Sequence, residues 1–290
     1  MRFALFGNIY QREKSGATRR LLDCLAAHHA EVTVDREYYD FLVKIGLIRE
    51  GEVRTFEDDQ FEADFAVSMG GDGTLLKTAS RVRDKQTPLL GVNMGRLGFL
   101  ADVTADEIEA CVDALYRGDY ICEKRALIKV ESDGNAFQGY NCALNDIAIL
   151  KRDTASMISI RASINGDFLT TYQADGLIVS TPTGSTAYSL SNGGPIIVPQ
   201  TGVMLLTAVA PHSLNIRPIV IPDTAEIELT VSSRSHTFLV AIDGRSESMP
   251  EGTTLRLSKA PYQVEVVKRK DARYFLTLRD KMMWGKDSRQ

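Results

Sequence analysis

The stretch Phe65-Ala66-Val67-Ser68-Met69-Gly70-Gly71-Asp72-Gly73-Thr74 joins an apolar run of strand character to a segment with helical periodicity. The segment after it has four apolar residues on one helical face, Leu75, Leu76, Ala79 and Val82. The sequence therefore predicts a strand, a glycine-rich turn and a helix that begins at Thr74. Glycines let main-chain N–H groups approach a ligand closely, and the helix adds the positive end of its dipole. Together these features predict a phosphate-binding turn.

Asp72 is the unusual member of this turn because a carboxylate repels a phosphate. A protein tolerates the pair when the carboxylate accepts a proton from a hydroxyl group or holds a divalent cation. The structural alternative is a tight turn with an aspartate cap. Glycine pairs are common, so the turn taken alone does not decide between a ligand site and a plain turn.

The composition narrows the class of protein. A chain of 290 residues can form one large or two ordinary domains with real cores. The net charge of -4 argues against general nucleic-acid binding, since no basic stripe exists to neutralise a phosphate backbone. No segment approaches the ~20 apolar residues of a membrane span, and the N-terminal apolar run is too short for a signal peptide. The sparse cysteines lack metal spacing and predict reduced thiols in a cytoplasmic protein: Cys24, Cys111, Cys122 and Cys142.

The first third of the chain alternates strand-like and helix-like segments. Strands are expected at 3–6, 32–34, 65–69 and 89–92, and helices at 15–29 and 38–45. Thr104 and Glu107 form a capping-box pattern before a helix that ends at Gly118. This alternation predicts an α/β domain with a parallel sheet and flanking helices. Ligands of such sheets lie at the carboxyl ends of the strands, where the glycine-rich turns 70–74 and 93–100 are expected.

The second half is β-rich and predicts two packed sheets with one short helix near Thr186. Its strongest hairpin pattern is the alternating run 158–164 followed by Asn165-Gly166, and Asp243-Gly244 predicts another hairpin. The expected domains are residues 1–120, the α/β phosphate-binding domain, and 121–270, the β-rich dinucleotide-binding domain. Residues 271–290 are expected to form a C-terminal tail, and its part 274–284 is a candidate to return to the first domain.

Two further motifs carry chemistry in the second half. Asn145-Asp146 stands at the edge of an apolar run and predicts either a grip on ribose hydroxyls or a simple turn. The run from Asp175 to Pro195 combines a strand, a turn rich in hydroxyl side chains and a helix start. A plain strand-turn-helix connection needs neither so many hydroxyls nor three glycines after the strand. This run therefore favours a ligand site.

Four blocks of the sequence together resemble the signature motifs of the NAD kinase family, in matching order and spacing over nearly the whole chain. They are Gly70–Thr74, Asn93–Leu100, Leu144–Asp146 and Asp175–Pro195. The resemblance implies an α/β domain paired with a β-rich domain, with the dinucleotide between them. It also implies a homodimer or homotetramer.

The resemblance implies transfer of the γ-phosphoryl group of ATP, or of another donor, to the adenosine ribose 2′-hydroxyl of NAD. A divalent metal, expected to be Mg²⁺, would take part, although the sequence assigns no metal ligand. Asp72 would be the base that accepts the hydroxyl proton. The residues expected to bind nucleotide or phosphate are Gly71, Asp72, Gly73, Thr74, Lys77, Asn145, Asp146, Asp175, Thr186, Ala187, Tyr188, Ser189, Leu190 and Ser191.

The role of Lys77 has a second interpretation, and the function of the protein has two further hypotheses. Lys77 lies one helical turn after Thr74, where its ammonium group would be near the phosphate site or simply in solvent. A lipid kinase that shares the first turn is a second hypothesis for the function, but it should present a large apolar surface. A nucleotide-sensing protein without catalysis is the third, and the presence of Asp72 argues against it.

Overall fold

The computed structural model describes residues 1–10, 16–95, 98–134, 137–153 and 156–283. The chain divides into two compact units, a first unit of Met1–Lys124 with Val264–Gln290 and a second unit of Arg125–Gln263. Two strands, β7 (Tyr120–Ser132) and β18 (Thr254–Arg269), carry the chain from one unit to the other. A compact unit is not by itself a domain that folds alone. The expected domain ranges 1–120, 121–270 and 271–290 therefore stay a prediction.

The first unit is built on a parallel sheet with the strand order β3-β2-β1-β4-β5. Val266 of β18 pairs in parallel with Leu89 of β5, and the short strand β6 also pairs with β5. The elements of this unit between β1 and β7 are β1 (Arg2–Gly7), α1 (Gly16–Ala27), β2 (Glu31–Asp35), α2 (Arg36–Lys44), β3 (Arg54–Phe56), β4 (Phe65–Gly70), α3 (Asp72–Val82), β5 (Leu89–Asn93), β6 (Val103–Thr104), the 3₁₀ turn η2 (Ala105–Glu107) and α4 (Ile108–Arg117).

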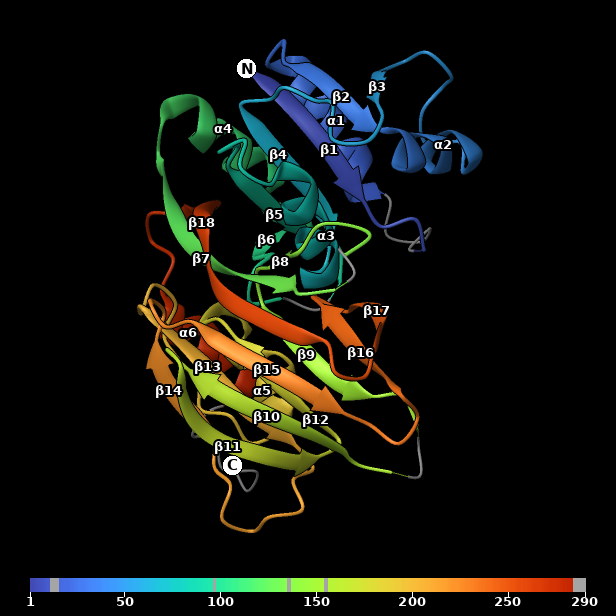
Figure 1. Ribbon diagram of the computed structural model, residues 1–290. Helices are drawn as coiled ribbons and strands as arrows, with labels where there is room; N and C mark the ends of the chain where they lie inside the picture. The colour runs from blue at the N-terminus through green and yellow to red at the C-terminus, as the bar shows by residue number, and fades with distance from the viewer. Residues whose placement is uncertain (11–15, 96–97, 135–136, 154–155, 284–290) are drawn as a thin grey trace. The chain divides into compact units, whose positions relative to one another are not determined.

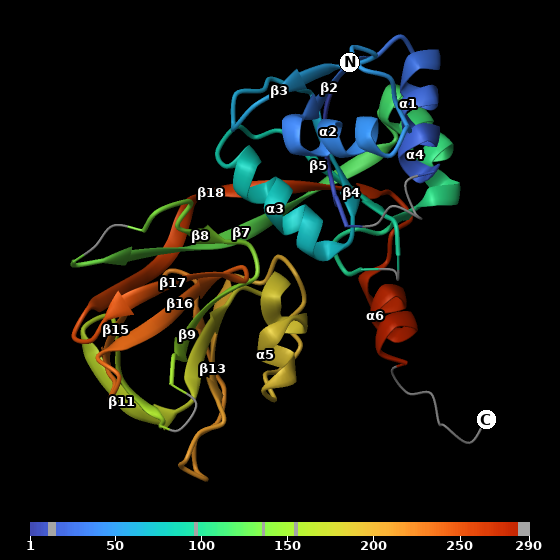
Figure 2. The same cartoon turned by 90° about the vertical axis from the view of Figure 1, so that its right-hand side faces the viewer.

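Helices cover both faces of this sheet, as the alternating pattern predicts. Phe3 and Leu5 of β1 point to one face, where they join a buried cluster with residues of α1 and α4. Figure 2 shows α1 and α4 side by side next to the strands. Phe6 points to the other face, where the guanidinium of Arg81 from α3 lies 5.7 Å from its ring centroid. The predicted α/β domain with a parallel sheet is confirmed (Figure 1).

The predicted ends of α4 are also confirmed. The hydroxyl and the backbone N–H of Thr104 both lie 2.9 Å from the Glu107 carboxylate, and this capping box opens η2 directly before α4. Gly118 ends the helix with φ of 69°, a left-handed conformation that glycine adopts without strain.

The second unit contains two sheets, so the predicted β-rich two-sheet architecture is confirmed. One has the strand order β14-β13-β12-β9-β16-β17, and the other includes β11-β10-β15-β18 with β7 and β8. The elements are β8 (Cys142–Ala143), β9 (Asp146–Lys151), β10 (Ile158–Ile164), β11 (Asp167–Ala174), β12 (Gly176–Ser180), the 3₁₀ turn η3 (Thr183–Thr186), α5 (Tyr188–Ser191), β13 (Val203–Val209), β14 (Ile219–Pro222), β15 (Ile227–Ser232), β16 (Thr237–Ile242) and β17 (Arg245–Pro250).

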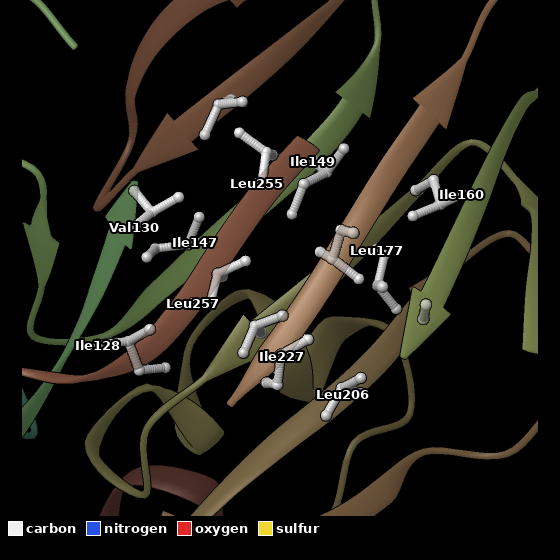
Figure 3. Packing of buried hydrophobic residues seen from close by; sticks show 14 of the residues in the cluster. Ile128, Val130, Ile147, Ile149, Ile160, Leu177, Leu206, Ile227, Leu255 and Leu257 are labelled. Atoms are coloured by element: carbon white, nitrogen blue, oxygen red, sulfur yellow. The ribbon is translucent and has the colours of Figure 1, made fainter. Parts of the chain in front are cut away.

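The core of the second unit lies where the inner faces of its two sheets meet. Figure 3 shows Ile147 and Ile149 of β9 and Leu177 of β12 opposite Ile227 of β15 and Leu257 of β18. These side chains expose none of their surface. Burial on this scale stabilises the fold by about 25 cal/mol per Å² of apolar surface removed from water. Buried residues alternate with more exposed ones along β10 and β15, and this alternation helps to fix the register of these two strands.

The two predicted hairpins are present. Asn165 and Gly166 connect β10 to β11 with φ of 52° and 85°. Asp243 and Gly244 connect β16 to β17 with φ of 47° and 83°. Positive φ at both central residues is the backbone requirement of the turn that joins two-residue hairpins, and it explains the Asx-Gly sequence. The predicted short helix near Thr186 corresponds to η3 and α5.

Several elements were not predicted. The strands β3 and β14 are short, β17 is polar and largely exposed, and β13 is a mostly apolar, largely buried run, so none of these sequences shows a clear alternation of apolar and polar residues. The end of the chain forms helix α6 (Tyr274–Met282), which belongs to the first unit. Two residues of the quoted motifs, Arg96 and Leu97, lie outside the described residues, as does Trp284. None of the described helices is long and apolar enough to span a membrane.

Candidate active site

The glycine-rich turn of the first unit leads directly from β4 into α3. The helix begins at Asp72, two residues earlier than predicted, because Gly71 in an extended conformation already serves as its N-cap. A Cβ at Gly70 would lie 2.2 Å from the hydroxyl of Thr74, so only glycine allows this tight turn. In contrast, a Cβ at Gly71 or Gly73 would meet nothing within 4 Å, so the turn is open on that side.

The first backbone N–H groups of α3 have no acceptor within the helix. They lie at the positive end of the helix dipole, beside the open side of the turn. The turn therefore has the donors and the space that a phosphate group requires.

The carboxylate of Asp72 accepts three backbone hydrogen bonds from the segment after β5. The N–H of Phe99 donates to Oδ2 at 2.7 Å, and the N–H groups of Leu100 and Ala101 donate to Oδ1, each at 3.0 Å. Gly98 permits this approach, because a Cβ there would lie 1.9 Å from Oδ1 of Asp72. The carboxylate is thus held in one orientation by the neighbouring loop.

Asn93 at the end of β5 stabilises the same loop from within. Its side-chain amide donates to the carbonyl oxygen of Ala101 at 3.1 Å, and its Oδ1 accepts the N–H of Gly95 at 2.6 Å. The motif 93–100 therefore contributes backbone donors that position Asp72. Sequence reasoning had noted this motif without assigning it that role.

Lys77 makes a surface ion pair. Its Nζ lies 2.7 Å from a carboxylate oxygen of Glu37, and the side chains are 59% and 54% exposed. The structure thus gives this lysine an acidic partner in solvent. Its predicted contact with phosphate stays a prediction.

In the second unit, a single carboxylate holds the Asn145-Asp146 motif. Asp243 accepts the N–H of Leu144 at 2.8 Å, that of Asn145 at 2.9 Å and that of Asp146 at 3.1 Å. Its own N–H donates to the carbonyl oxygen of Asp146 at 3.0 Å. Sequence reasoning used Asp243 only as a hairpin residue, because a bond across about 100 positions leaves no local signal in the sequence.

Asp146 and Asp243 form a buried pair of carboxyl groups. Burial, together with the smaller effect of the nearby charge of Asp243, raises the pKa of Asp146 to about 7. Burial also raises the pKa of Asp243, but the three backbone N–H donors oppose that effect. Since those donors stabilise the ionised form, Asp243 carries the charge and Asp146 holds the proton near neutral pH. Asp146 is therefore able to donate a hydrogen bond to a ligand.

The two second-unit motifs are in direct contact. The N–H of Thr181 donates to the carbonyl oxygen of Asn145 at 2.9 Å, and its hydroxyl donates to that of Leu144 at 2.6 Å. A Cβ at Gly184 would lie 2.0 Å from the Asn145 carbonyl oxygen, so glycine is required where the two loops meet. Within the described chain, Oδ1 of Asn145 and Oγ of Ser180 are buried without a hydrogen-bond partner. Such atoms are candidates for ligand contact.

Many hydroxyls of the run 175–195 are used within the protein. The hydroxyl of Ser185 donates to the Pro182 carbonyl at 2.7 Å, and that of Ser189 pairs with the Thr207 hydroxyl at 2.8 Å. Tyr188 is 40% exposed, and Ser191 is also exposed. The remaining predicted residues, Thr186, Ala187 and Leu190, are half-buried. The hydroxyl-rich composition therefore serves in part to build the turn, and the ligand contacts expected of these residues stay a prediction.

Asp175 lies apart from this group. It directly precedes β12, whose other end, Ser180, pairs with Asp146. Five residues of strand separate the two ends by roughly 16 Å. Asp175 instead forms an ion pair of 2.8 Å with Lys151. The structure therefore does not bring Asp175 together with Asn145 and Asp146, and its ligand role stays a prediction.

Comparisons with known proteins connect both halves to one family. The family model described as ATP-NAD kinase N-terminal domain matches residues 3–120 of this chain. The family model described as ATP-NAD kinase C-terminal domain matches residues 144–269. The NAD kinase of Bacteroides fragilis is 54% identical over 289 residues, and that of Cytophaga hutchinsonii is 40% identical over 291 residues. Both alignments cover 100% of each chain.

Two solved structures share the fold. A yeast NADH kinase complexed with NADH has a TM-score of 0.88 at 22% identity, covering 99% of this chain and 89% of that one. An NAD kinase from Archaeoglobus fulgidus in complex with ATP has a TM-score of 0.77 at 25% identity, covering 98% of this chain and 99% of that one.

The contact between Gly98 and Asp72 predicts a specific cost. Gly98→Ala should destabilise the protein by about 1–3 kcal/mol, because the new Cβ forces the carboxylate away from its donors. Gly73→Ala is the matched control, since its Cβ meets nothing and alanine favours a helix. Urea unfolding measures both, and hydrogen exchange at 99–101 should rise only in Gly98→Ala. Equal stability of the two variants would contradict the prediction.

The buried carboxyl pair predicts a pH-dependent stability. The pKa of Asp146 is near 3.8 when unfolded and about 7 when folded, so only the unfolded state releases this proton between those values. Stability from this group is complete below pH 3.8 and falls until about pH 7, by up to about 1.4 kcal/mol per pH unit. Asp146→Asn removes the effect, so the variant should gain stability relative to wild type from pH 4 to 7. Urea titrations across this range that show a constant difference would refute the prediction.

Proposed function

The chain belongs to the ATP-NAD kinase family and acts as an NAD kinase, and we propose that Asp72 is the base of this reaction. The reaction transfers the γ-phosphoryl group of ATP to the 2′-hydroxyl of the adenosine ribose of NAD. The observation that carries the proposal is the fixed carboxylate of Asp72, which lies at the open, glycine-rich start of α3. Three backbone N–H groups of the loop after β5 hold this carboxylate in place.

Asp72 has the chemistry that the acceptor hydroxyl requires. A ribose hydroxyl is a poor nucleophile at neutral pH, and a positioned carboxylate that accepts its proton helps in the transition state. Phosphoryl transfer otherwise depends on positioning and on neutralising charge. The N–H groups of Asp72 and Gly73, which follow the N-cap Gly71, would supply donors to phosphoryl oxygens, whereas the N–H of Thr74 already donates to the Gly71 carbonyl at 3.0 Å.

A divalent metal is expected to take part in this reaction. The described residues contain no cluster of three or more His, Cys, Asp or Glu side chains. This fits Mg²⁺, which is commonly held by substrate phosphates, water and few carboxylates. Bound together with the nucleotide, Mg²⁺ would neutralise phosphate charge. The chain's own part is then to orient the phosphates and the acceptor.

The second unit supplies groups for the dinucleotide. Asn145 offers a buried Oδ1 that has no hydrogen-bond partner among the described residues, and Asp146 in its protonated form donates a hydrogen bond. An acceptor and a donor side by side match the hydroxyls of a ribose. Further contacts are proposed from the turn that follows β12, namely Thr186, Ala187, Tyr188, Ser189, Leu190 and Ser191, and from Asp175.

Three other features complete the proposal. Lys77 would reach phosphate only by leaving Glu37. A homodimer or homotetramer is proposed from the family resemblance, as is a location in the cytoplasm.

The function is tested by incubating the full chain with ATP, Mg²⁺ and NAD and detecting NADP with an NADP-specific dehydrogenase. We expect NADP to form and diacylglycerol to remain unphosphorylated under the same conditions. Lipid phosphorylation without NADP would assign the chain to lipid kinases that share the first turn. Binding of NAD in calorimetry without any turnover would identify a nucleotide sensor instead.

Asp72→Asn separates catalysis from binding. The variant lacks the base and should lose at least ~10² in kcat, while its affinity for NAD changes less than about tenfold. Asparagine offers one oxygen in place of two, so at least one of the three N–H bonds is also lost, and hydrogen exchange at 99–101 should increase. Single-turnover kinetics and calorimetry with NAD measure the two effects. Full kcat in the variant would remove Asp72 from the mechanism.

A further inference from the structure

Helix α6 places a lysine against the loop that holds Asp72. Nζ of Lys281 lies 4.4 Å from the centroid of the Phe99 ring. The backbone N–H of this same Phe99 donates to Oδ2 of Asp72 at 2.7 Å. Lys281 lies about 180 residues after Phe99 in the sequence, yet both residues belong to the same compact unit as Asp72. The C-terminal helix thus reaches the backbone that positions the proposed base.

The amino group of Lys281 is buried without a hydrogen-bonding partner. Its Nζ exposes almost no surface and makes no hydrogen bond to any described residue. An ammonium group carries three N–H donors, and the face of an aromatic ring attracts the charge without accepting those bonds as an oxygen would. Leaving such donors unpaired is costly, so the position favours an additional acceptor.

The charges around Lys281 come from three elements. Asp72 of α3 and Asp102, in the segment before β6, favour the ammonium form, whereas Lys268 of β18 disfavours it. Burial outweighs these effects and lowers the pKa of Lys281 to about 8. Lys268 is already used, because it donates to the Leu100 carbonyl at 3.0 Å and to Asp102 at 2.7 Å. Lys281 therefore has donors without an acceptor among the described residues, and its ammonium form is favoured by the negative charge of Asp72.

We infer that Lys281 donates to a phosphoryl oxygen of the bound nucleotide, next to Asp72. This inference rests on the proposed function, because it assumes that phosphate binds at the start of α3. A phosphate that approaches Asp72 is repelled by its carboxylate, and the ammonium of Lys281 offsets that repulsion. Strong acceptor oxygens of a phosphate also match the unpaired donors of a buried ammonium group. The phosphate comes either from ATP or from the pyrophosphate of NAD.

Lys281→Met tests the charge. Methionine keeps the long apolar stem against Phe99 but has no ammonium group. Loss of a charge-assisted hydrogen bond should weaken kcat/KM about 10- to 100-fold. Steady-state kinetics with ATP and NAD varied in turn identify the phosphate, because a contact to the donor changes the constants for ATP and a contact to the dinucleotide changes those for NAD. Binding of inorganic tripolyphosphate by calorimetry gives a second measure that needs no turnover.

Two further variants control for structural effects. Lys281→Arg keeps the positive charge and should retain activity within about threefold of wild type. Lys270→Met removes an exposed lysine from the same C-terminal segment, one that pairs with Asp119 at 2.8 Å, and should leave kinetics unchanged. The thermal midpoint of Lys281→Met should stay near that of wild type.

Two results would overturn the inference. One is wild-type kinetics and tripolyphosphate affinity in Lys281→Met. The other is equal loss in the methionine and arginine variants together with a lower thermal midpoint, which would make Lys281 a packing residue. If wild type forms no NADP, the proposed function fails separately, and tripolyphosphate affinity still decides whether Lys281 binds phosphate.

Discussion

The grip of three backbone N–H groups on the carboxylate of Asp72 is the constraint on which the first unit depends. It ties the start of α3, which follows β4, to the loop after the neighbouring strand β5. Close packing around it leaves room only for glycine at two positions: Gly98 against the carboxylate and Gly91 against Ala101. The N–H dipoles also offset the charge of Asp72, so an anionic ligand can approach a turn that contains an acidic residue.

The second unit uses the same device. Asp243 binds three consecutive backbone N–H groups, of Leu144, Asn145 and Asp146, and fixes the loop that presents Asn145 and Asp146. The carboxylates of Asp243 and Asp72 differ in their burial and in their effect on neighbouring groups. Asp243 is buried and keeps its neighbour Asp146 protonated near neutral pH, which turns that residue into a donor. Asp72 is only partly buried and lies beside open space, as a group that exchanges protons with a substrate must.

Local patterns in the sequence predicted the local parts of this structure. The capping box at Thr104, the Asx-Gly hairpins and the turn 70–74 depend on neighbouring residues, and the structure has all of them. The start of α3 was placed two residues too late, since Gly71 gives no side-chain signal of its role as N-cap. The roles of Asp243 and Lys281 depend on partners about 100 and 180 positions away, which no periodicity reveals. The ligand role of the hydroxyl-rich run stays a prediction, because composition does not distinguish a hydroxyl that builds a turn, as those of Ser185 and Ser189 do, from one that contacts a ligand.

The chain order adds a constraint on how the proposed catalytic loop is completed. The second unit is one continuous segment inserted into the first, whose last part begins at Val264. That part supplies Val266, which pairs with Leu89 of β5, and Lys268, which binds the Leu100 carbonyl 168 residues earlier. Contacts across such distances form late, because closing the long intervening loop costs entropy before the contacts stabilise it. The loop that orients Asp72 therefore gains its contact with Lys268 only after the second unit has been synthesised and the C-terminal segment has packed against β5.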